Sequence, residues 1–399
     1  MMLDGVKVLE YCNSVAGAYC TKQLGDLGAE VIKIENPIRG DWARRAGPFP
    51  GDIPHPEKSG LFLYVNMNKL GITLDPAVPT GQKIFTEIAR TSDIVVEDNP
   101  PQYLEQIGLG YTELNKLRPN IIVTSITPFG QTGPYTHYKA YSLNIFQGSG
   151  VGHITPEGYK NLDRPPLKQG KFVTDYHVGI GATLITLGML FSRQTTGHGQ
   201  HIDFSMQEWE MNLLKPKWEM FIYEGFIPSR KTVVRQGNAM IPCKDGYVTI
   251  ILLEEHQWLR FIELTGKEEW LTDERFLDPY RRAEHGIELN ALITDWAKDY
   301  TMKEIYHRGQ EMGVPIGMVN RPSNLYSSQQ LRERQFFVDI NHPLAGRLNY
   351  PGTAYKFSGM VSTRYKPAPT LGQHNEEIYC GRLGYTKEDL VALHQACII

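Results

Sequence analysis

The amino-acid sequence predicts an α/β fold, with a large doubly wound domain and a smaller second domain. The chain has 399 residues, more than a single hydrophobic core usually serves. In its first half, short apolar strands alternate with helical segments, which is typical of a parallel sheet covered by helices. After residue 228 the pattern changes to a strand followed by several amphipathic helices. We therefore expect two hydrophobic cores.

The first half repeats a strand–helix–strand pattern. GVKVLEY and EVIKIE are short apolar strands, and the segment between them, AGAYCTKQLGDLGA, has helical spacing. Further along, Ile84, Phe85, Ile88 and Ala89 share one face of a helix that leads into the strand DIVVED. The predicted strands lie at 5–11, 30–35, 93–98 and 121–126, and the predicted helices at 16–29 and 81–92; the segment 111–120 leads into the last of these strands.

A long apolar segment follows Asp175. The next 17 residues contain no Asp, Glu, Lys or Arg. That length is at the short end of the roughly 17–25 residues that a membrane span needs. Three glycines, three hydroxyl residues and His177 interrupt the segment, so a core helix at about 174–193 is the better prediction. Because apolar residues cover nearly its whole circumference, we expect this helix to be buried.

The remaining segments define the predicted domains. HIDFSM predicts a strand, and the residues after it predict a helix that is interrupted at Pro216. A strand in KDGYVTIILL and three helices at 254–266, 280–301 and 302–313 follow. The predicted parts are a large domain at 1–200, a linker at 201–227, a small domain at 228–325, and a return linker with the C-terminal part of the large domain at 326–399.

Composition argues against several classes of protein. A net charge of -3 provides no field for nucleic acid or for anionic membranes. The five cysteines form no CxxC pair, which favours a reducing compartment over a disulfide framework. The start of the chain has no apolar run of signal-peptide type, so a cytoplasmic location is expected. The twelve histidines show no HxH or HExxH spacing, and no metal site is predicted.

The first strand–helix turn, CNSVAG, does not match a dinucleotide-binding turn. That turn usually has a GxGxxG pattern, in which glycines let a pyrophosphate approach the helix, whereas only Gly17 is present here. Glu35 ends the second strand, where an acid can bind a ribose, but a single acid is a weak signal. A nicotinamide-dependent oxidoreductase therefore remains a minor alternative. A GxSxG nucleophile turn is also missing.

Helix rules alone leave the role of Asp175 open. Aspartate is a favoured N-cap residue that stabilises a helix by about 1 kcal/mol, and capping is the simplest interpretation. The alternative is that the carboxylate takes part in chemistry. For His177 the same choice arises between a partly buried, hydrogen-bonded imidazole and a functional side chain.

The sequence resembles the class III CoA-transferases, the family that includes formyl-CoA transferase and carnitine CoA-transferase, with α-methylacyl-CoA racemase as a related branch. The matching segments occur in order along almost the whole chain. They are LGDLGAEVIKIENP with GDWAR, NMNKLGITLD, SDIVVEDNPP with IGLGYTELNKLRPNIIVTSITPFGQTGPY, TDYHVGIGATLITLGMLFSRQTTGHGQHIDFSM, GNAMIPCKDGYVTI, and PAPTLGQHNEEIYCGRLGY.

The resemblance implies a reaction and a fold. In the family, an aspartate at the head of this helix is the nucleophile, and it corresponds to Asp175. The implied activity is transfer of CoA from an acyl-CoA donor to a carboxylic acid acceptor, through an aspartyl anhydride and an aspartyl-CoA thioester. CoA thioester is then a substrate, and no tightly bound cofactor is implied. The family fold is a Rossmann-like large domain built from both chain ends and a smaller α+β domain, in an interlocked, ring-like homodimer.

The CoA site carries over only in part. Gln106 and Asn36 replace arginines of formyl-CoA transferase, which leaves the phosphate contacts open to nearby arginines at positions 39, 44 and 45. Several residues do fall at the family's CoA-binding positions, with two lysines suited to phosphates. The predicted CoA-binding residues are Val15, Ala16, Lys69, Asp98, Asn99, Lys139 and Tyr141.

The racemase branch is the main alternative. Racemisation needs a base and an acid on opposite faces of the substrate, and that branch has a histidine in a GHDINY motif. Here KAYSLNIF places Tyr141 at the histidine position and Ser142 beside it, so a transferase is favoured. His177 and His153 are the residues that would overturn this preference.

The expected acyl group is larger than oxalate or formate. The formyl-CoA transferase branch has a run of four glycines that closes over the aspartate, and no such run is present here. Four aromatic residues are candidates either for lining a roomier pocket or for ordinary packing. They are Trp209, Trp218, Tyr176 and Tyr141.

Overall fold

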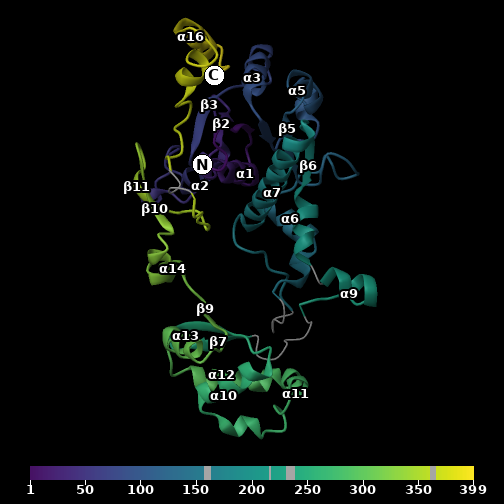
Figure 1. Ribbon diagram of the computed structural model, residues 1–399, viewed down its shortest axis with the longest axis vertical. Coiled ribbons are helices and arrows are strands. Elements are labelled where there is room, and N and C mark those ends of the chain that lie inside the picture. Colours follow the sequence, from purple (N-terminus) through teal and green to yellow (C-terminus); the bar gives the residue numbers. More distant parts are fainter. Residues whose placement is uncertain (157–162, 215–216, 231–238, 360–364) are drawn as a thin grey trace. The chain divides into compact units, whose positions relative to one another are not determined.

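The computed structural model describes residues 1–156, 163–214, 217–230, 239–359 and 365–399 (Figure 1). The chain divides into two compact units. The first comprises Met1–Thr155, Pro166–Gly225 and Gln335–Ile399, and the second comprises Pro156–Pro165 and Phe226–Arg334. The second unit thus includes a short segment before the Asp175 helix and extends further than the predicted 228–325.

The first unit contains a six-stranded parallel sheet. Its strand order is β3-β2-β1-β4-β5-β6. Leu9 of β1 pairs with Ile32 of β2 on one side and with Val95 of β4 on the other. The order reverses at this point, and open α/β sheets of this order bind ligands outside the carboxyl ends of the two strands there. The strands are β1 (Lys7–Tyr11), β2 (Glu30–Glu35), β3 (Lys69–Thr73), β4 (Ile94–Glu97), β5 (Ile122–Thr127) and β6 (His201–Ser205).

Helices cover both faces of this sheet (Figure 1). On one face, α1 (Val15–Asp26) and α7 (Val173–Thr196) pack on Val8, Val96 and Ile126. On the other face, α3 (Pro79–Thr91) and α5 (Tyr111–Leu117) pack on Leu9 and Val95. The four apolar residues predicted to share a face of α3 are all buried, which confirms that prediction. The doubly wound α/β architecture is therefore confirmed.

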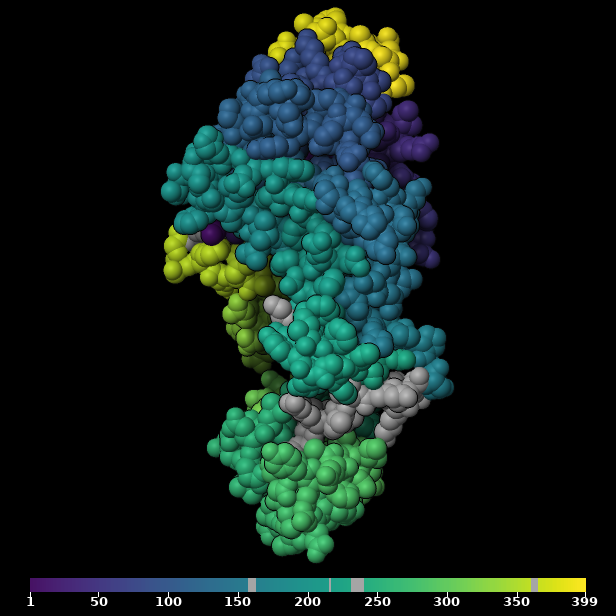
Figure 2. Space-filling model, turned by 90° about the vertical axis from the view of Figure 1, so that its right-hand side faces the viewer, coloured from purple at the N-terminus to yellow at the C-terminus, as the bar shows by residue number. Residues whose placement is uncertain are grey.

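The C-terminal segment packs against the edge strand β3. Tyr379 donates a hydrogen bond to the carbonyl oxygen of Thr73 at 2.5 Å, and the amide of Asp75 donates to Ile398 at 2.8 Å. Figure 2 shows these C-terminal residues in yellow against the blue N-terminal half. The segment consists of the hairpin β10 (Phe337–His342) and β11 (Gly346–Pro351), the short helix η6 (Glu376–Cys380), and α16 (Lys387–Gln395).

Three expectations need correction. Residues 201–205, assigned above to a linker, form the edge strand β6, because they complete the ladder with β5. The strand β3 was not predicted, because its five residues include only two large apolar side chains, those of Leu70 and Ile72. The helix α7 is not buried all round. Its inner face packs on α1 and the sheet, but four apolar side chains are exposed on the described chain: Ile180, Leu184, Ile185 and Phe191.

The second unit has its own core. A three-stranded antiparallel sheet, β7 (Ala239–Cys243), β8 (Gly246–Ile250) and β9 (Ile316–Met318), packs with helices around Trp258, Phe261 and Trp296. Its helices are α10 (Glu255–Thr265), η5 (Glu268–Leu271), α11 (Pro279–Glu284), α12 (Gly286–Ala297), α13 (Met302–Glu311), α14 (Pro322–Tyr326) and α15 (Gln329–Glu333).

The first unit also contains shorter helices. They are η1 (Trp42–Arg45), η2 (Pro50–Asp52), α2 (Gly60–Val65), α4 (Tyr103–Gln106), α6 (Ser142–Gly148), η3 (Val151–Ile154), α8 (Met206–Met211), η4 (Asn212–Leu214) and α9 (Lys217–Glu224). Pro216, the predicted point of interruption, lies outside the described residues. Within the described ranges, no helix combines the length and the apolar character that crossing a membrane requires.

Candidate active site

Asp175 lies in the first turn of α7 and does not cap the helix. The N-cap position is occupied by Phe172, whose φ of 66 places it in the left-handed region. Asp175 is the third residue after it, so the capping interpretation is wrong. The amide groups of this first turn lack partners within the helix, and the helix dipole favours a negative charge here. The position therefore suits a carboxylate that must stay ionised.

The carboxyl group of Asp175 is buried, with 8% of the residue exposed. The hydroxyl group of Ser142, at the start of α6, donates a hydrogen bond to Oδ2 of Asp175. Burial raises the pKa of Asp175 above its ordinary value, while the Ser142 hydrogen bond, the aspartate's own amide and the charge of Lys168 lower it. The last three effects favour the ionised form, which is the nucleophilic one.

Sequence reasoning did not identify Ser142 as a partner of Asp175. Its only signal was its place beside Tyr141, in a segment that departs from the racemase motif. The two residues come together because α6 packs against both α7 and α8. Their contact joins segments that are 33 residues apart in sequence, which no local pattern indicates.

Close packing of α7 on α1 fixes the position of Asp175. A Cβ atom at Gly179 would lie 2.8 Å from the carbonyl oxygen of Ala16, so glycine is required for this approach. The rings of Tyr176 and Tyr19 meet edge to face, with centroids 4.8 Å apart. The nucleophile candidate is therefore held on a rigid element beside the first strand–helix loop.

The loops that follow β1 and β4 are tied together at the reversal point of the sheet. The carboxylate of Asp98 accepts hydrogen bonds from the amides of Asn13 and Ser14, each at 2.7 Å. Burial raises the pKa of Asp98 to about 6. A Cβ atom at Gly17 would lie 2.8 Å from Oδ2 of Asp98, which explains the glycine in this turn.

Four of the predicted CoA-binding residues lie at this reversal point. Val15 and Ala16 begin α1 and are buried. Asn99 follows Asp98, and its side-chain amide donates to the carbonyl oxygen of Tyr11 at 3.2 Å. The structure thus brings the residues after β1 and β4 together. The start of a helix is a place where phosphate or carbonyl oxygens commonly bind.

The two predicted lysines occupy opposite environments. Lys69 is buried, and its ammonium group contacts Glu10 at 2.8 Å, the carbonyl oxygen of Ala18 at 2.8 Å and Asn66 at 2.9 Å. Glu10 also pairs with the buried Lys33. Lys69 would have to give up these partners to reach a phosphate. Lys139, in contrast, is exposed.

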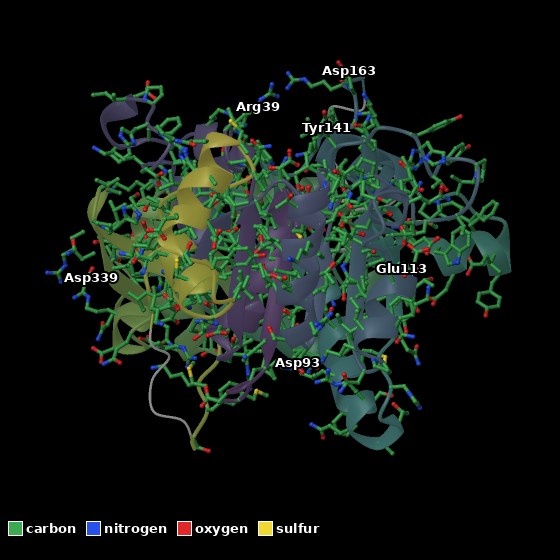
Figure 3. All side chains as sticks on the ribbon, turned by 90° about the horizontal axis from the view of Figure 1, so that it is seen from above. Arg39, Asp93, Glu113, Tyr141, Asp163 and Asp339 are labelled. Carbon is green, nitrogen blue, oxygen red and sulfur yellow. The ribbon has the colours of Figure 1, made fainter. Side chains whose placement is uncertain are left out.

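The neighbouring arginines also differ. Arg44 is 1% exposed and pairs with Glu35 at 2.7 Å and Glu57 at 2.6 Å, so its guanidinium group is committed to the fold. Arg39 and Arg45 are exposed. Tyr141 is 79% exposed and, like Arg39, is labelled in Figure 3. Among these three arginines, only Arg39 and Arg45 are placed to meet an external anion.

A second carboxyl group lies beside the first turn of α7. Glu210, on α8, is completely buried, and its Oε2 is 3.8 Å from Nδ1 of His177. Burial raises the pKa of Glu210 to about 7; the Thr174 hydroxyl lowers it, and the negative charge of Asp175 raises it further. Sequence reasoning missed Glu210, because QEWEM gives no sign of which glutamate is buried. His153 is exposed.

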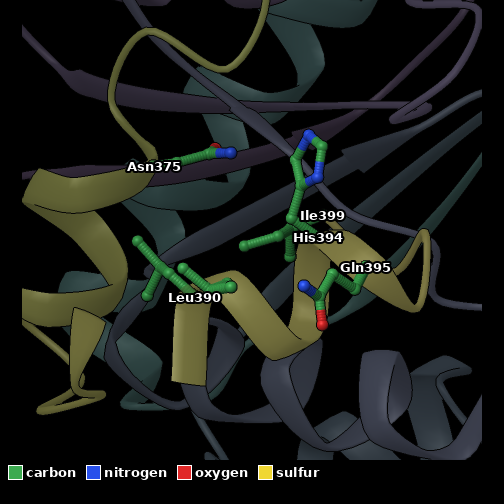
Figure 4. A pocket seen from close by; sticks show the side chains of 6 residues that line it. Asn375, Leu390, His394, Gln395 and Ile399 are labelled. Carbon is green, nitrogen blue, oxygen red and sulfur yellow. The ribbon is translucent and has the colours of Figure 1, made fainter. Parts of the chain in front are cut away.

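The predicted aromatic residues do not gather into one pocket. Tyr176 packs on Tyr19, and the indole N–H of Trp209 donates to the carbonyl oxygen of His177 at 3.0 Å. Trp218 is 45% exposed on α9. An open hollow shown in Figure 4 is lined by C-terminal residues and contains none of the predicted site residues. In the described part of the chain, no cluster of three or more potential ligands could hold a metal ion.

Comparison with known sequences identifies relatives of this chain. The succinyl-CoA:glutarate CoA-transferase of Mus musculus is 32% identical over 386 residues, covering 94% of this chain and 85% of the mouse protein. The succinyl-CoA–D-citramalate CoA-transferase of Chloroflexus aurantiacus is 32% identical, covering 100% of this chain and 98% of its own. A formyl-CoA:oxalate CoA-transferase of Rhodopseudomonas palustris is 30% identical, covering 99% and 96%.

Solved structures show the same fold. A CAIB/BAIF family protein from Brucella suis superimposes with a TM-score of 0.83 at 27% identity, covering 95% of this chain and 98% of the other. The Rv3272 protein of Mycobacterium tuberculosis has the same fold at 23% identity, with a TM-score of 0.80. The sequence model of CoA-transferase family III matches residues 3–375. The chain is therefore a member of CoA-transferase family III and an enzyme of the class III CoA-transferase type.

Proposed function

We propose that this enzyme transfers CoA between carboxylic acids by covalent catalysis at Asp175. The observation that carries the proposal is the placement of that carboxylate. It lies in the first turn of a rigid helix, receives a hydrogen bond from Ser142 and keeps 8% of its surface exposed. A carboxylate so oriented is an activated nucleophile of the kind that forms acyl-enzyme intermediates.

The proposed reaction balances in four steps. An oxygen of Asp175 attacks the thioester carbonyl, the C–S bond breaks, and CoA thiolate leaves an aspartyl anhydride. The thiolate attacks the aspartyl carbonyl and releases the donor acid as its carboxylate, which leaves an aspartyl-CoA thioester. The acceptor carboxylate attacks the carbonyl of that thioester, the C–S bond breaks, and CoA thiolate leaves a second anhydride. The thiolate then attacks the acceptor's carbonyl and restores Asp175. No proton is consumed overall.

The proposed CoA site runs from the sheet's reversal point to the loop before α6. Val15, Ala16 and the segment of Asp98 and Asn99 supply the inner end, where the start of α1 meets the polar side chains of the β4 loop. The exposed Lys139 supplies a positive charge for a phosphate. Lys69 stabilises the fold around the site through its buried ion pair with Glu10 and does not contact CoA in this proposal.

The substrates proposed for a first assay follow from the relatives. The mouse and Chloroflexus relatives are named for succinyl-CoA as donor, with glutarate and D-citramalate as acceptors. We infer a donor and acceptor of this size for the present enzyme. The chain has no run of four glycines of the kind expected for formyl-CoA and oxalate. Succinyl-CoA with a panel of dicarboxylic and monocarboxylic acids is therefore the assay to begin with.

We also infer that the enzyme is a homodimer. The outer face of α7 presents Ile180, Leu184 and Phe191, which are 50%, 59% and 74% exposed on the single chain. Large exposed apolar stripes of this kind mark surfaces that a partner covers. The interlocked arrangement expected for the family would cover this stripe with a second copy of the chain.

The test of the proposed chemistry is trapping of acylated Asp175. Wild-type enzyme incubated with succinyl-CoA and hydroxylamine should yield a peptide in which Asp175 is converted to its hydroxamate, detected by mass spectrometry. Asp175→Asn should abolish both trapping and CoA exchange while keeping the wild-type circular dichroism spectrum. Asp299→Asn, at an exposed position, serves as the control and should change neither.

Two results would contradict the proposal. Turnover retained by Asp175→Ala at the wild-type rate would exclude covalent catalysis at this residue. Exchange of the substrate's α-proton for solvent deuterium without any acceptor acid would favour a racemase, which needs an acid and a base rather than a nucleophile.

A further inference from the structure

A buried carboxyl group on α8, that of Glu210, lies against α7, the helix whose first turn carries the proposed nucleophile. Glu210 has no exposed surface, and neither of its carboxyl oxygens makes a hydrogen bond of full geometry among the described residues, although the nearby Thr174 hydroxyl favours its ionised form. The Nδ1 atom of His177 is also without a hydrogen-bond partner in that part of the chain, and it is 3.8 Å from Oε2 of Glu210. Buried polar groups in proteins are normally satisfied, so an unsatisfied pair beside a reacting group requires an explanation.

Two titratable groups of α7 lie near Glu210, the carboxyl group of Asp175 and the imidazole of His177. Thr174 and His177 are three residues apart and therefore share a face of the helix, against which α8 carries Glu210. Asp175 directly follows Thr174 in the first turn of the helix. The other packing element, α6, contains no charged residue. On β6, His201 contacts Ser125, and Asp203 accepts from Gln131.

We propose that Glu210 is a positioning residue for the reaction at Asp175. Glu210 holds a proton while Asp175 is ionised, and it passes this proton to His177 when Asp175 is acylated. The proposal rests on the covalent role of Asp175 given above. A neutral Glu210 leaves Asp175 as the single negative charge of the resting site. Two adjacent buried carboxylates would repel each other and the incoming acid.

The proton transfer balances charge at each stage. In the proposed resting state Asp175 is negative, Glu210 carries the proton, and Nδ1 of His177 is open to accept it. Acylation moves the negative charge of Asp175 onto the departing CoA thiolate. The O–H bond of Glu210 then breaks and an N–H bond forms at Nδ1 of His177, which leaves a carboxylate beside an imidazolium. When Asp175 is released again as a carboxylate, the proton returns to Glu210. The raised pKa of Glu210 and its dependence on Asp175 agree with this exchange.

The direct test is infrared difference spectroscopy at pH 6.5 with succinyl-CoA as the acylating probe. Resting wild-type enzyme should show a carboxylic-acid band that is absent from the isosteric variant Glu210→Gln. The band should disappear when Asp175 is acylated. Glu208→Gln, on the same helix but exposed, is the matched control and should keep the band. In His177→Gln the band should persist after acylation, because the proton has no acceptor.

The pH dependence of CoA exchange provides an independent readout. Above a pH near 7 the wild-type rate should fall by up to about tenfold per pH unit, because ionised Glu210 then opposes anionic substrates. Glu210→Gln should remove this alkaline limb, whereas Glu208→Gln should retain it. A merely structural role of Glu210 would lower the rate equally at every pH.

The outcomes separate the two proposals. A carboxylic-acid band that survives acylation in the wild type, or an alkaline limb unchanged in Glu210→Gln, overturns the role of Glu210. Hydroxylamine trapping in the same samples reports acylation itself. If the wild type traps no acyl group at Asp175, the covalent mechanism fails instead. The wild-type spectra alone decide the question if Glu210→Gln does not fold.

Discussion

The hydroxyl group of Ser142 donates a hydrogen bond to the carboxylate of Asp175 and so links α6 to the first turn of α7. The donor lowers the pKa of a carboxyl group that burial would otherwise raise further. It also fixes the direction of the oxygen that it contacts. In the proposed mechanism the carboxylate attacks a thioester, so this one contact would serve both its ionisation and its orientation.

We predict that Ser142→Ala weakens catalysis most at acidic pH. Loss of the donor raises the pKa of Asp175, so a smaller fraction is ionised and the acid limb of the rate profile moves to higher pH. One charge-assisted hydrogen bond of roughly 1.5 kcal/mol corresponds to a loss of about tenfold in kcat there. A pH profile of CoA exchange measures this. Ser142→Thr keeps the hydroxyl group and should restore the wild-type limb; equal loss in both variants would argue against the hydrogen bond.

Lys69 is expected to act on stability and not on CoA affinity. Lys69→Met leaves the buried Glu10 with one cationic partner fewer. Breaking a buried ion pair destabilises a fold by about 3–5 kcal/mol, which urea denaturation would show. Lys83→Met removes an exposed lysine and should stay within about 0.5 kcal/mol of wild type. If Lys69→Met is as stable as the wild type but has a raised KM for acyl-CoA, the result would instead support the prediction that Lys69 contacts a phosphate.

Lys139 is expected to act on CoA affinity and not on stability. It is exposed, so Lys139→Ala should not change the denaturation midpoint. Loss of one charged contact to a phosphate raises KM for acyl-CoA by roughly tenfold. The corresponding acyl-pantetheine, which lacks the nucleotide, should show no change in KM. Lys116→Ala, another exposed lysine, is the control for general charge effects. The same KM increase with both thioesters would place Lys139 away from the nucleotide.

The outer face of α7 should hold the dimer together. Leu184→Asp places a charge in an apolar stripe and should convert the enzyme to monomers, as measured by size-exclusion chromatography with light scattering. Val391 is equally exposed on α16, and Val391→Asp should leave the mass unchanged. A dimeric Leu184→Asp protein would show that the partner binds elsewhere.

Glu210 makes the stability of the fold depend on pH. Its pKa is about 7 in the folded chain and 4.5 ordinarily. Between these values the folded state binds a proton that the unfolded state does not, so stability falls as pH rises through this window. Glu210→Gln cannot bind this proton and so lacks the effect. Between pH 4 and pH 8, its free energy of unfolding should therefore rise relative to that of the wild type by up to about 3 kcal/mol. Denaturation at the two pH values checks this, and Glu208→Gln should track the wild type.

The local pattern predicted most of the first unit. The strand pattern and the spacing of Ile84, Phe85 and Ile88 can be recognised from neighbouring residues, and the side chains that they place on one face are buried. The strand β3 was missed, because a five-residue segment with two apolar side chains is a weak signal and its place in the sheet depends on pairing with β2. Strand β6 was predicted, but its membership of the large sheet was not, since that depends on β5.

The sequence by itself determined the family of the enzyme and the place of Asp175 at the start of an apolar helix. These properties are local, because helix and strand periods and family motifs are read from neighbouring residues. Only the tertiary structure decided which lysine is buried beside Glu10, that Ser142 meets Asp175, and that Glu210 is buried near His177 of α7. The cost of burying a charge, and therefore its protonation, depends on groups that distant segments bring close.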